Sequence, residues 1–134
     1  MEFEIVNLEP ISQYQYLSSN KRYVTKRGKA WMKEYKKQLT EQMEKFKYTK
    51  LKSCSIKCEI TLTFCNRRKN DIDNGLHYCL DGMENIVYEN DRYITHLVAT
   101  KCYKKKEECC IKIKISNLET TPQPASESCT FVIV

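Results

Sequence analysis

The chain has 134 residues, which is enough for one ordinary domain and too few for two. A hydrophobic share of 41% supports a packed core and excludes a globally disordered chain, and no apolar run approaches the roughly 20 residues of a membrane-spanning helix. The net charge of +6 is unevenly spread: residues 20–52 hold twelve Lys or Arg against three Glu, whereas residues 70–95 hold six acidic residues against Arg92 alone. A basic surface around an acidic pocket suits an enzyme that cuts a polyanion with a metal ion, although a solvated Lys-rich helix has the same composition.

The first half of the chain predicts a strand, a helix and a second strand. Residues 2–8 alternate weakly between charged and apolar side chains, and we expect a strand that Pro10 ends. Residues 12–29 are polar and basic, and we expect a loop there. From Ala30 to about residue 47 the spacing predicts a helix, because large apolar residues recur every three or four positions: Trp31, Tyr35, Leu39, Met43 and Phe46. Residues 53–65 place an apolar side chain at every second position, which predicts a strand with one buried face.

The second half predicts a helix, two strands and a tail. A helix over about 73–86 has its apolar stripe at Leu76, Leu80, Met83 and Val87. Residues 93–103 predict a third strand, residues 104–108 a charged turn, and residues 111–115 a final strand with one solvated face. The order β-α-β-α-β-β predicts a single α+β domain over residues 1–116, with two helices packed on a mixed sheet. Residues 117–134 hold two Pro and no basic residue, so we expect a flexible tail.

An acidic segment follows the second strand, directly after the basic residues Arg67, Arg68 and Lys69. In an extended connection, Asp71 and Asp73 would point the same way while Ile72 points into the core. Two hard oxygen donors on one side suit Mg²⁺. A calcium loop of the EF-hand type is excluded, because its Gly and Glu positions hold Leu76 and Gly82. The plainer alternative is that Asp73 or Asn74 caps the helix and Asp71 is solvated.

Asp91 is the candidate for a third metal ligand. The predicted helix is about 20 Å long, so its far end lies well away from Asp73. Residues 87–91 can span about 17 Å when extended, which is enough to return toward the start of the helix. The spacing therefore permits convergence of the three carboxylates without showing it.

The eight cysteines do not indicate a zinc site. No Cys-x-x-Cys occurs, the two histidines are isolated, and Cys109 and Cys110 are adjacent, so their side chains point to opposite faces of a strand. Residues 1–9 carry three acidic residues and no basic one, unlike the start of a signal peptide. We therefore expect reduced thiols in a cytoplasmic protein, or a nuclear one in a eukaryotic host, with no membrane association.

Taken together, these residues resemble the RusA family of Holliday junction resolvases. The segment Asp71-Ile72-Asp73-Asn74 is followed by Leu80-Asp81-Gly82 and by Ile86-Val87-Tyr88 with Asp91. Upstream, Ser18 or Ser19 with Asn20-Lys21-Arg22-Tyr23 is similar to the family's Ser-x-Asn element. The resemblance covers roughly residues 10–115. It implies a homodimeric nuclease that makes Mg²⁺-dependent symmetric nicks in four-way DNA junctions.

Carried over residue by residue, the resemblance makes Asp71, Asp73 and Asp91 the metal ligands, with Mn²⁺ as a possible substitute for Mg²⁺. Asn74 would orient a ligand, and Asp81 would support the site from the same helix.

Two positions depart from the family. His77 stands where the family usually has a catalytic Lys, so it becomes the candidate catalytic residue that donates a proton or contacts phosphate. Asn90 stands where an acid often precedes the last Asp. These departures leave open an alternative function, a non-catalytic protein that binds branched DNA.

The DNA contacts expected of such a protein are made by basic and polar side chains, because phosphate contacts supply most of the affinity. The candidates are Asn20, Lys21, Arg22, Lys26, Arg27, Lys29, Arg67, Arg68 and Lys69. Tyr14 and Tyr16 are candidates for base stacking or dimer contacts. Symmetric cutting of two strands requires two active sites related by a two-fold axis, which a homodimer provides, and we expect it to form through the sheet or the first helix.

Overall fold

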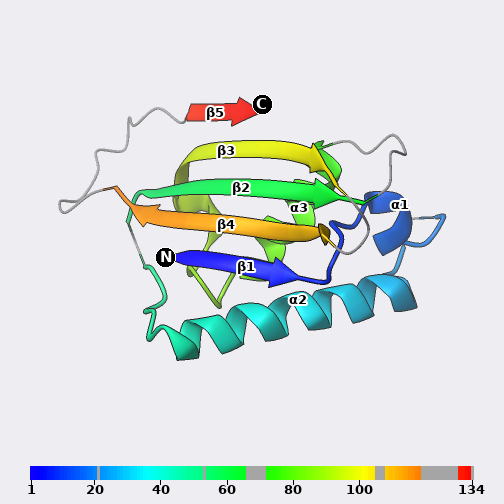
Figure 1. Cartoon of the computed structure of the whole chain (residues 1–134), viewed down its shortest axis with the longest axis horizontal. Helices are drawn as coiled ribbons and strands as arrows, with labels where there is room; N and C mark the ends of the chain where they lie inside the picture. Colours follow the sequence, from blue (N-terminus) through cyan, green and yellow to red (C-terminus); the bar gives the residue numbers. More distant parts are fainter. Residues whose placement is uncertain (21, 53, 66–71, 105–107, 119–129, 134) are drawn as a thin grey trace.

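One mixed β-sheet organises the protein. The structure, a computed structural model, describes residues 1–20, 22–52, 54–65, 72–104, 108–118 and 130–133, with the backbone alone for residues 13, 14, 72–74 and 130–133. Within these ranges five strands follow the order β1-β4-β2-β3-β5 (Figure 1). Their bounds are Glu2–Val6 for β1, Ile56–Phe64 for β2, Ile94–Tyr103 for β3, Cys110–Asn117 for β4 and Thr130–Ile133 for β5. Strand β4 is antiparallel to β1 and β2, whereas β3 is parallel to β2 and β5.

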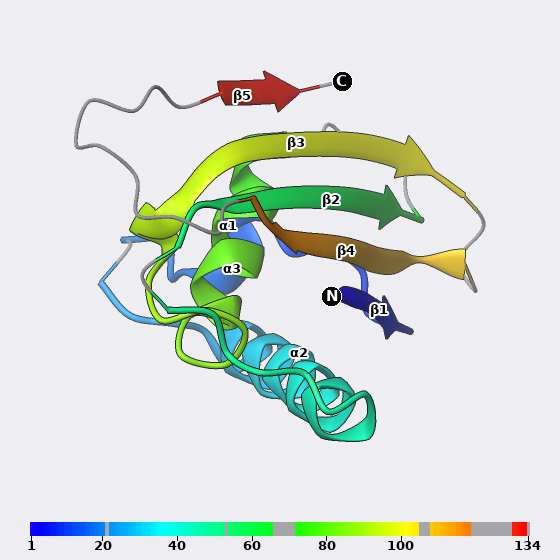
Figure 2. The ribbon, with the colours of Figure 1, turned by 90° about the vertical axis from the view of Figure 1, so that its left-hand side faces the viewer.

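Both long helices cover the same face of the sheet (Figure 2). Helix α2 (Lys26–Lys45) lies along β1, and α3 (Ile72–Met83) connects the parallel strands β2 and β3. A four-residue helix α1 (Gln13–Tyr16) and a 3₁₀ turn η1 (Asp91–Tyr93) complete the described elements. The predicted single α+β domain, with two helices on a mixed sheet, is therefore confirmed. The predicted homodimer remains a prediction.

The alternation in the sequence places the core on the helix side of the sheet. Five side chains of β2 are at most 2% exposed: Ile56, Cys58, Ile60, Leu62 and Phe64. On the opposite face Lys112 and Lys114 of β4 are exposed, as predicted for a strand with one solvated face. The sheet therefore packs one face against the helices and, within the single chain, presents the other to solvent.

Helix α2 begins four residues before the predicted start at Ala30. Thr25 caps it, because its Oγ1 accepts a hydrogen bond from the Gly28 amide at 3.0 Å. The loop predicted over residues 12–29 is thus wrong for its last part, and Lys26 and Arg27 lie in the first turn of the helix. Gly28 belongs there because a Cβ atom would lie 2.6 Å from the Tyr16 carbonyl oxygen.

Helix α3 also differs at both ends from its predicted range of 73–86. It begins at Ile72, so Asp73 lies in the helix and the extended connection predicted through Asp73 is wrong at that residue. An acidic residue and an amide in the first turn favour helix there. The helix ends at Met83, and Asn85 adopts a positive φ of 67° two residues later.

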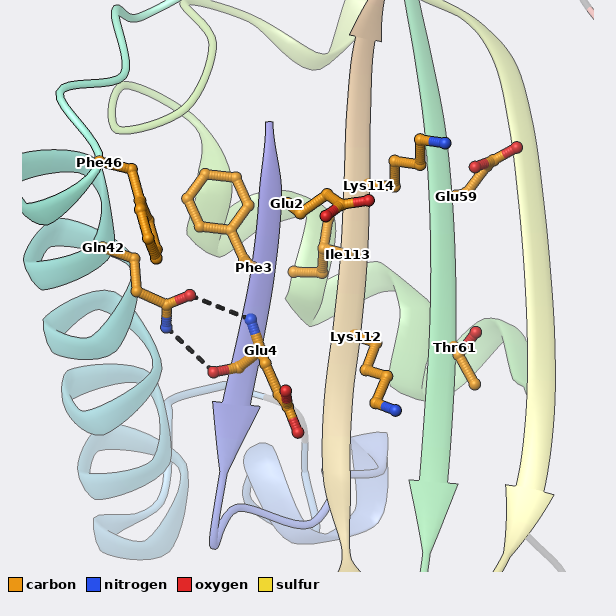
Figure 3. A pocket seen from close by; sticks show the side chains of 10 residues that line it. All are labelled: Glu2, Phe3, Glu4, Gln42, Phe46, Glu59, Thr61, Lys112, Ile113 and Lys114. Atoms are coloured by element: carbon orange, nitrogen blue, oxygen red, sulfur yellow. Dashed lines mark hydrogen bonds between the residues drawn. The ribbon is translucent and has the colours of Figure 1, made fainter.

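Side chains of α2 and the following turn cover the exposed edge of β1. The amide of Gln42 accepts from the Glu4 N–H and donates to the Glu4 carbonyl, both at 3.0 Å (Figure 3). Gln38 makes the same pair of bonds with Val6 at 2.9 Å, and the Tyr48 hydroxyl accepts from the Glu2 N–H at 3.3 Å. Because an unpaired strand edge attracts other strands, this ladder protects the sheet from edge-to-edge association.

The C-terminal segment adds a strand that the sequence did not predict. Residues 130–133 pair in parallel with β3, within the stretch expected to be a flexible tail. Among the described residues, no helix is both long and apolar enough to cross a membrane.

Candidate functional site

The acidic segment leads into the first turn of α3. Asp73 and Asn74 lie within this helix, which starts at Ile72, and their side chains are outside the described atoms. Asp71 and the basic residues Arg67, Arg68 and Lys69 lie outside the described residues. Asp73, His77 and Asp81 follow each other at four-residue intervals, which places them along one side of the helix. The helix therefore aligns three of the predicted site residues.

His77 and Asp81 form a pair on this side of α3. The Nε2 atom of His77 lies 3.2 Å from Oδ2 of Asp81, and the two side chains are 65% and 45% exposed. Asp81 therefore orients the imidazole ring, and it interacts with the positive charge whenever His77 is protonated. This contact joins two of the predicted site residues, and the supporting role of Asp81 remains a prediction.

A stacked pair of tyrosines lies beside Asp81. The rings of Tyr16, from α1, and Tyr78, from α3, stack with centroids 4.0 Å apart, and Tyr78 also meets the His77 ring edge-on at 5.0 Å. Partial burial, and then the negative charge of Asp81, raise the pKa of Tyr16. Burial, Tyr16 and Asp81 raise the pKa of Tyr78. No sequence motif selects Tyr78, because only the fold brings α1 against α3.

Asp91 is exposed and is the first residue of η1. Asn90 caps this turn, because its Oδ1 accepts a hydrogen bond from the Arg92 amide at 2.9 Å. The Asn that departs from the family pattern therefore has a local structural role.

Asp91 lies within electrostatic range of the second half of α3. Burial first, and then the charges of Cys58, Asp91, Glu84 and Asp81, raise the pKa of Tyr88. The Tyr88 hydroxyl donates to the carbonyl oxygen of Leu80 at 2.7 Å, which places this group of charges near that part of the helix. Convergence of Asp71, Asp73 and Asp91 on one metal ion remains a prediction, because Asp71 and the Asp73 side chain are not described.

Exposed cations surround the start of α2. The Asn20 Oδ1 accepts hydrogen bonds from the Ser18 hydroxyl at 2.6 Å and from the Arg22 amide at 3.1 Å, so the Ser-x-Asn element forms a tight turn. Beyond it Arg22, Lys26, Arg27 and Lys29 are exposed, and Lys21 lies outside the described residues. This turn joins α1 to α2, and the Tyr16–Tyr78 stack attaches α1 to α3. The fold thus brings the basic stretch to the part of the molecule that holds His77.

A pocket of about 480 Å³ lies elsewhere, between α2, β1 and the solvent-facing side of the sheet (Figure 3). Its charged lining is mixed and includes Glu2, Glu4, Glu59, Lys112 and Lys114. None of the predicted site residues lines this pocket. It therefore gives no support to a small-molecule site at the predicted residues.

Comparison with known protein families gives one match. The sequence matches the endodeoxyribonuclease RusA family over residues 8–116, a range that includes every predicted site residue. No curated protein matches the chain. The matched range covers most of the domain, from two residues after β1 to the last residue but one of β4. The chain therefore belongs to the RusA family of endodeoxyribonucleases.

Proposed function

We propose that this protein is a Mg²⁺-dependent, structure-selective endonuclease that resolves four-way DNA junctions by paired symmetric nicks. The observation that carries the proposal is the family match over residues 8–116, a range that includes Asp71, Asp73 and Asp91. The exposed basic residues before and within the first turn of α2 agree with a DNA substrate.

The donor set fits Mg²⁺. Three carboxylates offer only hard oxygen ligands, and the one whose side chain the structure describes, Asp91, is exposed. Asp71, Asp73 and Asp91 would hold the ion, and Mn²⁺ would substitute because it accepts the same ligands. When bound, the metal activates water and stabilises the charge that develops on the scissile phosphate.

His77 would act on the phosphate from the exposed side of α3. Its contact with Asp81 is made through Nε2, so Nδ1 would be the ring nitrogen that meets the substrate. In the protonated form that nitrogen can donate to a phosphate oxygen or to the leaving oxygen. The pair would substitute in part for the lysine that the family usually has.

The basic residues would position DNA by contacting its backbone. Arg22, Lys26, Arg27 and Lys29 are exposed along the turn before α2 and its first turn. Lys21 and the three basic residues 67–69 would extend this surface. Such contacts are insensitive to sequence and weaken as salt rises, so affinity for DNA should fall steeply with ionic strength.

Paired nicks require two copies of the site. A two-fold symmetric homodimer supplies them in the arrangement that a four-way junction needs. Light scattering at low micromolar concentration should report about twice the chain mass of 15.9 kDa. A species of 15.9 kDa alone, both free and on DNA, would contradict the dimer.

The proposal is tested by comparing cleavage and binding of a labelled four-way junction. In Mg²⁺, the wild-type protein and Glu89→Gln should cut, because Glu89 is an exposed acid close in sequence to Asp91 and outside the predicted site. Asp91→Asn should lower the rate by about 100-fold or more, because it removes a metal ligand. All three proteins should bind the junction in chelator. Binding by the wild-type protein without cleavage in Mg²⁺ or Mn²⁺ would instead establish the alternative function, a non-catalytic DNA-binding protein.

A further inference from the structure

A cluster of sulfur and oxygen ligands lies at one end of the sheet. Among the described residues, Glu9, Cys65 and Cys109 form the one group of three whose metal-binding atoms all lie within 4.8 Å of one another. Cys65 directly follows β2, Cys109 directly precedes β4, and Glu9 lies between β1 and α1. These segments are neighbours because β4 pairs with both β1 and β2, with Cys110 opposite Val6 and opposite Thr63 (Figure 1).

Hydrogen bonds hold both the main chain and the side chain of Glu9. The main-chain carbonyl of Glu9 accepts a hydrogen bond from Trp31 Nε1 at 2.8 Å, and Trp31 is a core residue of α2. The second set of bonds is made by the carboxylate. Its Oε2 accepts a hydrogen bond from the Cys65 amide at 2.9 Å and another from the Cys65 thiol. A preorganised ligand of this kind adds specificity to a binding site. The cluster is therefore built by the fold rather than by a chance meeting of surface side chains.

We propose that Glu9, Cys65 and Cys109 bind a zinc-like divalent cation. Two thiolates and one carboxylate match the ligands of Zn²⁺, whereas Mg²⁺ takes oxygen ligands only. A tetrahedral Zn²⁺ ion with bonds of about 2.3 Å to sulfur and about 2.0–2.2 Å to oxygen holds these atoms about 3.5–3.8 Å apart. The separations in the structure are within 4.8 Å, so small side-chain rotations complete the site. The fourth position is left for water.

The Cys65 thiol donates its hydrogen bond to the carboxylate of Glu9. The hydrogen bond to Glu9, followed by partial burial and the charges of Glu9 and Cys109, raises the pKa of Cys65 to about 12. A bound cation replaces the proton on Cys65 and the one on Cys109, and both protons pass to solvent.

The site would fix the point at which the chain leaves the sheet toward the acidic segment. Six residues after Cys65 comes Asp71, and α3 starts at Ile72. A cation bound by Glu9, Cys65 and Cys109 would tie the ends of β1 and β2 to the start of β4. It would be separate from the Mg²⁺ of the proposed nuclease site.

Cobalt(II) tests the proposal with a readout that does not depend on nuclease activity. Protein prepared free of metal should bind one equivalent of Co²⁺ with the near-ultraviolet absorption that thiolate-to-cobalt charge transfer produces. Oxygen ligands such as Asp71 or Asp91 give no such band, so failure of the nuclease proposal would not change this result. Zn²⁺ should displace the Co²⁺ and abolish the band.

Matched variants locate the ligands. Cys65→Ser and Cys109→Ser should weaken Co²⁺ binding by at least about 100-fold and remove the charge-transfer band, because loss of an outer-shell partner alone weakens binding about 10- to 100-fold. Glu9→Gln should weaken binding while the band stays. Cys102→Ser is the matched control, because Cys102 is another partly buried free thiol that lies in β3. It should bind Co²⁺ as the wild type does.

A second measurement uses only the wild-type protein, so its result does not depend on whether the variants fold. It follows how Zn²⁺ protects the thiols from alkylation. Zn²⁺ should slow alkylation of Cys109 by about tenfold or more, because a metal-bound thiolate is no longer a free nucleophile, and should leave Cys102 unchanged. Absence of the charge-transfer band at one equivalent, or its persistence in Cys65→Ser or Cys109→Ser, would overturn the proposal. A disulfide between Cys65 and Cys109 in place of the band would also overturn it.

Discussion

Replacing Gly82 by Ala tests how α3 is held against α2. Gly82 is buried, and a Cβ atom there would lie 2.5 Å from both Cδ2 and Cε2 of Tyr35 and 2.9 Å from Sδ of Met32. The Tyr35 ring cannot simply move away, because it is fully buried, stacks on Trp31 with centroids 4.9 Å apart and donates to the Cys79 carbonyl at 2.8 Å. The substitution therefore forces the two helices apart or displaces the tyrosine.

The expected magnitude follows from three opposing effects. Ala is a better helix former than Gly by about 1 kcal/mol, which favours the variant. Overpacking a closed core costs about 1–3 kcal/mol, and breaking the Tyr35–Cys79 hydrogen bond leaves a buried hydroxyl unpaired at a further cost of about 1–3 kcal/mol. Gly82→Ala should thus lower the free energy of unfolding by roughly 1–5 kcal/mol and the melting temperature by several degrees.

The measurement is denaturant and thermal unfolding beside a Gly75→Ala control in the same helix. A Cβ atom at Gly75 would meet its nearest neighbour, Leu62 Cδ1, at 3.2 Å and the next atoms at 3.6 Å, so it needs only a slight adjustment. Gly75→Ala should therefore be close to neutral, with the helix propensity offsetting the tighter contact. A Gly82→Ala protein as stable as the wild type would show that the contact between α2 and α3 does not require glycine at this position.

Three further perturbations have defined outcomes. Replacing Gln38 and Gln42 by Ala should lower the free energy of unfolding by about 0.5–1.5 kcal/mol for each lost hydrogen bond. It should also increase self-association in light scattering, because the edge of β1 loses its cover. Unchanged association would contradict that protective role. Burial raises the pKa of Cys79 to about 12 and raises that of Cys58 as well, so the unfolded chain loses these protons at lower pH than the folded chain does. The free energy of unfolding should therefore be fully retained below about pH 8.5 and fall between about pH 9 and 12, by up to about 1.4 kcal/mol per pH unit for each thiol. A free energy of unfolding that stays constant over that range, measured with denaturant, would contradict this prediction. His77→Lys restores the residue usual in the family and should raise junction cleavage at pH 8 by about tenfold or more, because lysine stays charged there; an equal or lower rate would show that His77 is adapted to its own role.

Hydrophobic periodicity predicted most of the fold. The strand with six alternating apolar positions became β2, and the apolar stripe at Trp31, Tyr35 and Leu39 became the buried face of α2. These predictions held because burial of one face is decided by local spacing. The start of α2 was missed because Gly28, three residues after the Thr25 cap, disfavours a helix in the sequence pattern. The close approach of Tyr16 that requires this Gly is a tertiary contact, which the sequence does not show.

The site was predictable only in part. The resemblance selected His77 and Asp81, and the structure places them in contact at 3.2 Å. Tyr78 was not selected, because its partner Tyr16 is distant in sequence and lies against it only in the folded chain. The grouping of Cys65 and Cys109 was missed for the same reason: motif spacing detects ligands on one segment, whereas these thiols lie at the ends of two paired strands.

In the proposed function, Asp71, Asp73 and Asp91 direct metal-dependent cleavage of branched DNA. The most direct test maps the cuts in a labelled synthetic four-way junction in Mg²⁺, beside linear duplex and single strand of the same sequence, with Asp71→Asn as the control. We predict paired nicks at symmetric positions in the junction alone, lost in Asp71→Asn while junction binding persists. Equal cutting of all three substrates, or cutting that Asp71→Asn retains, would contradict the claim.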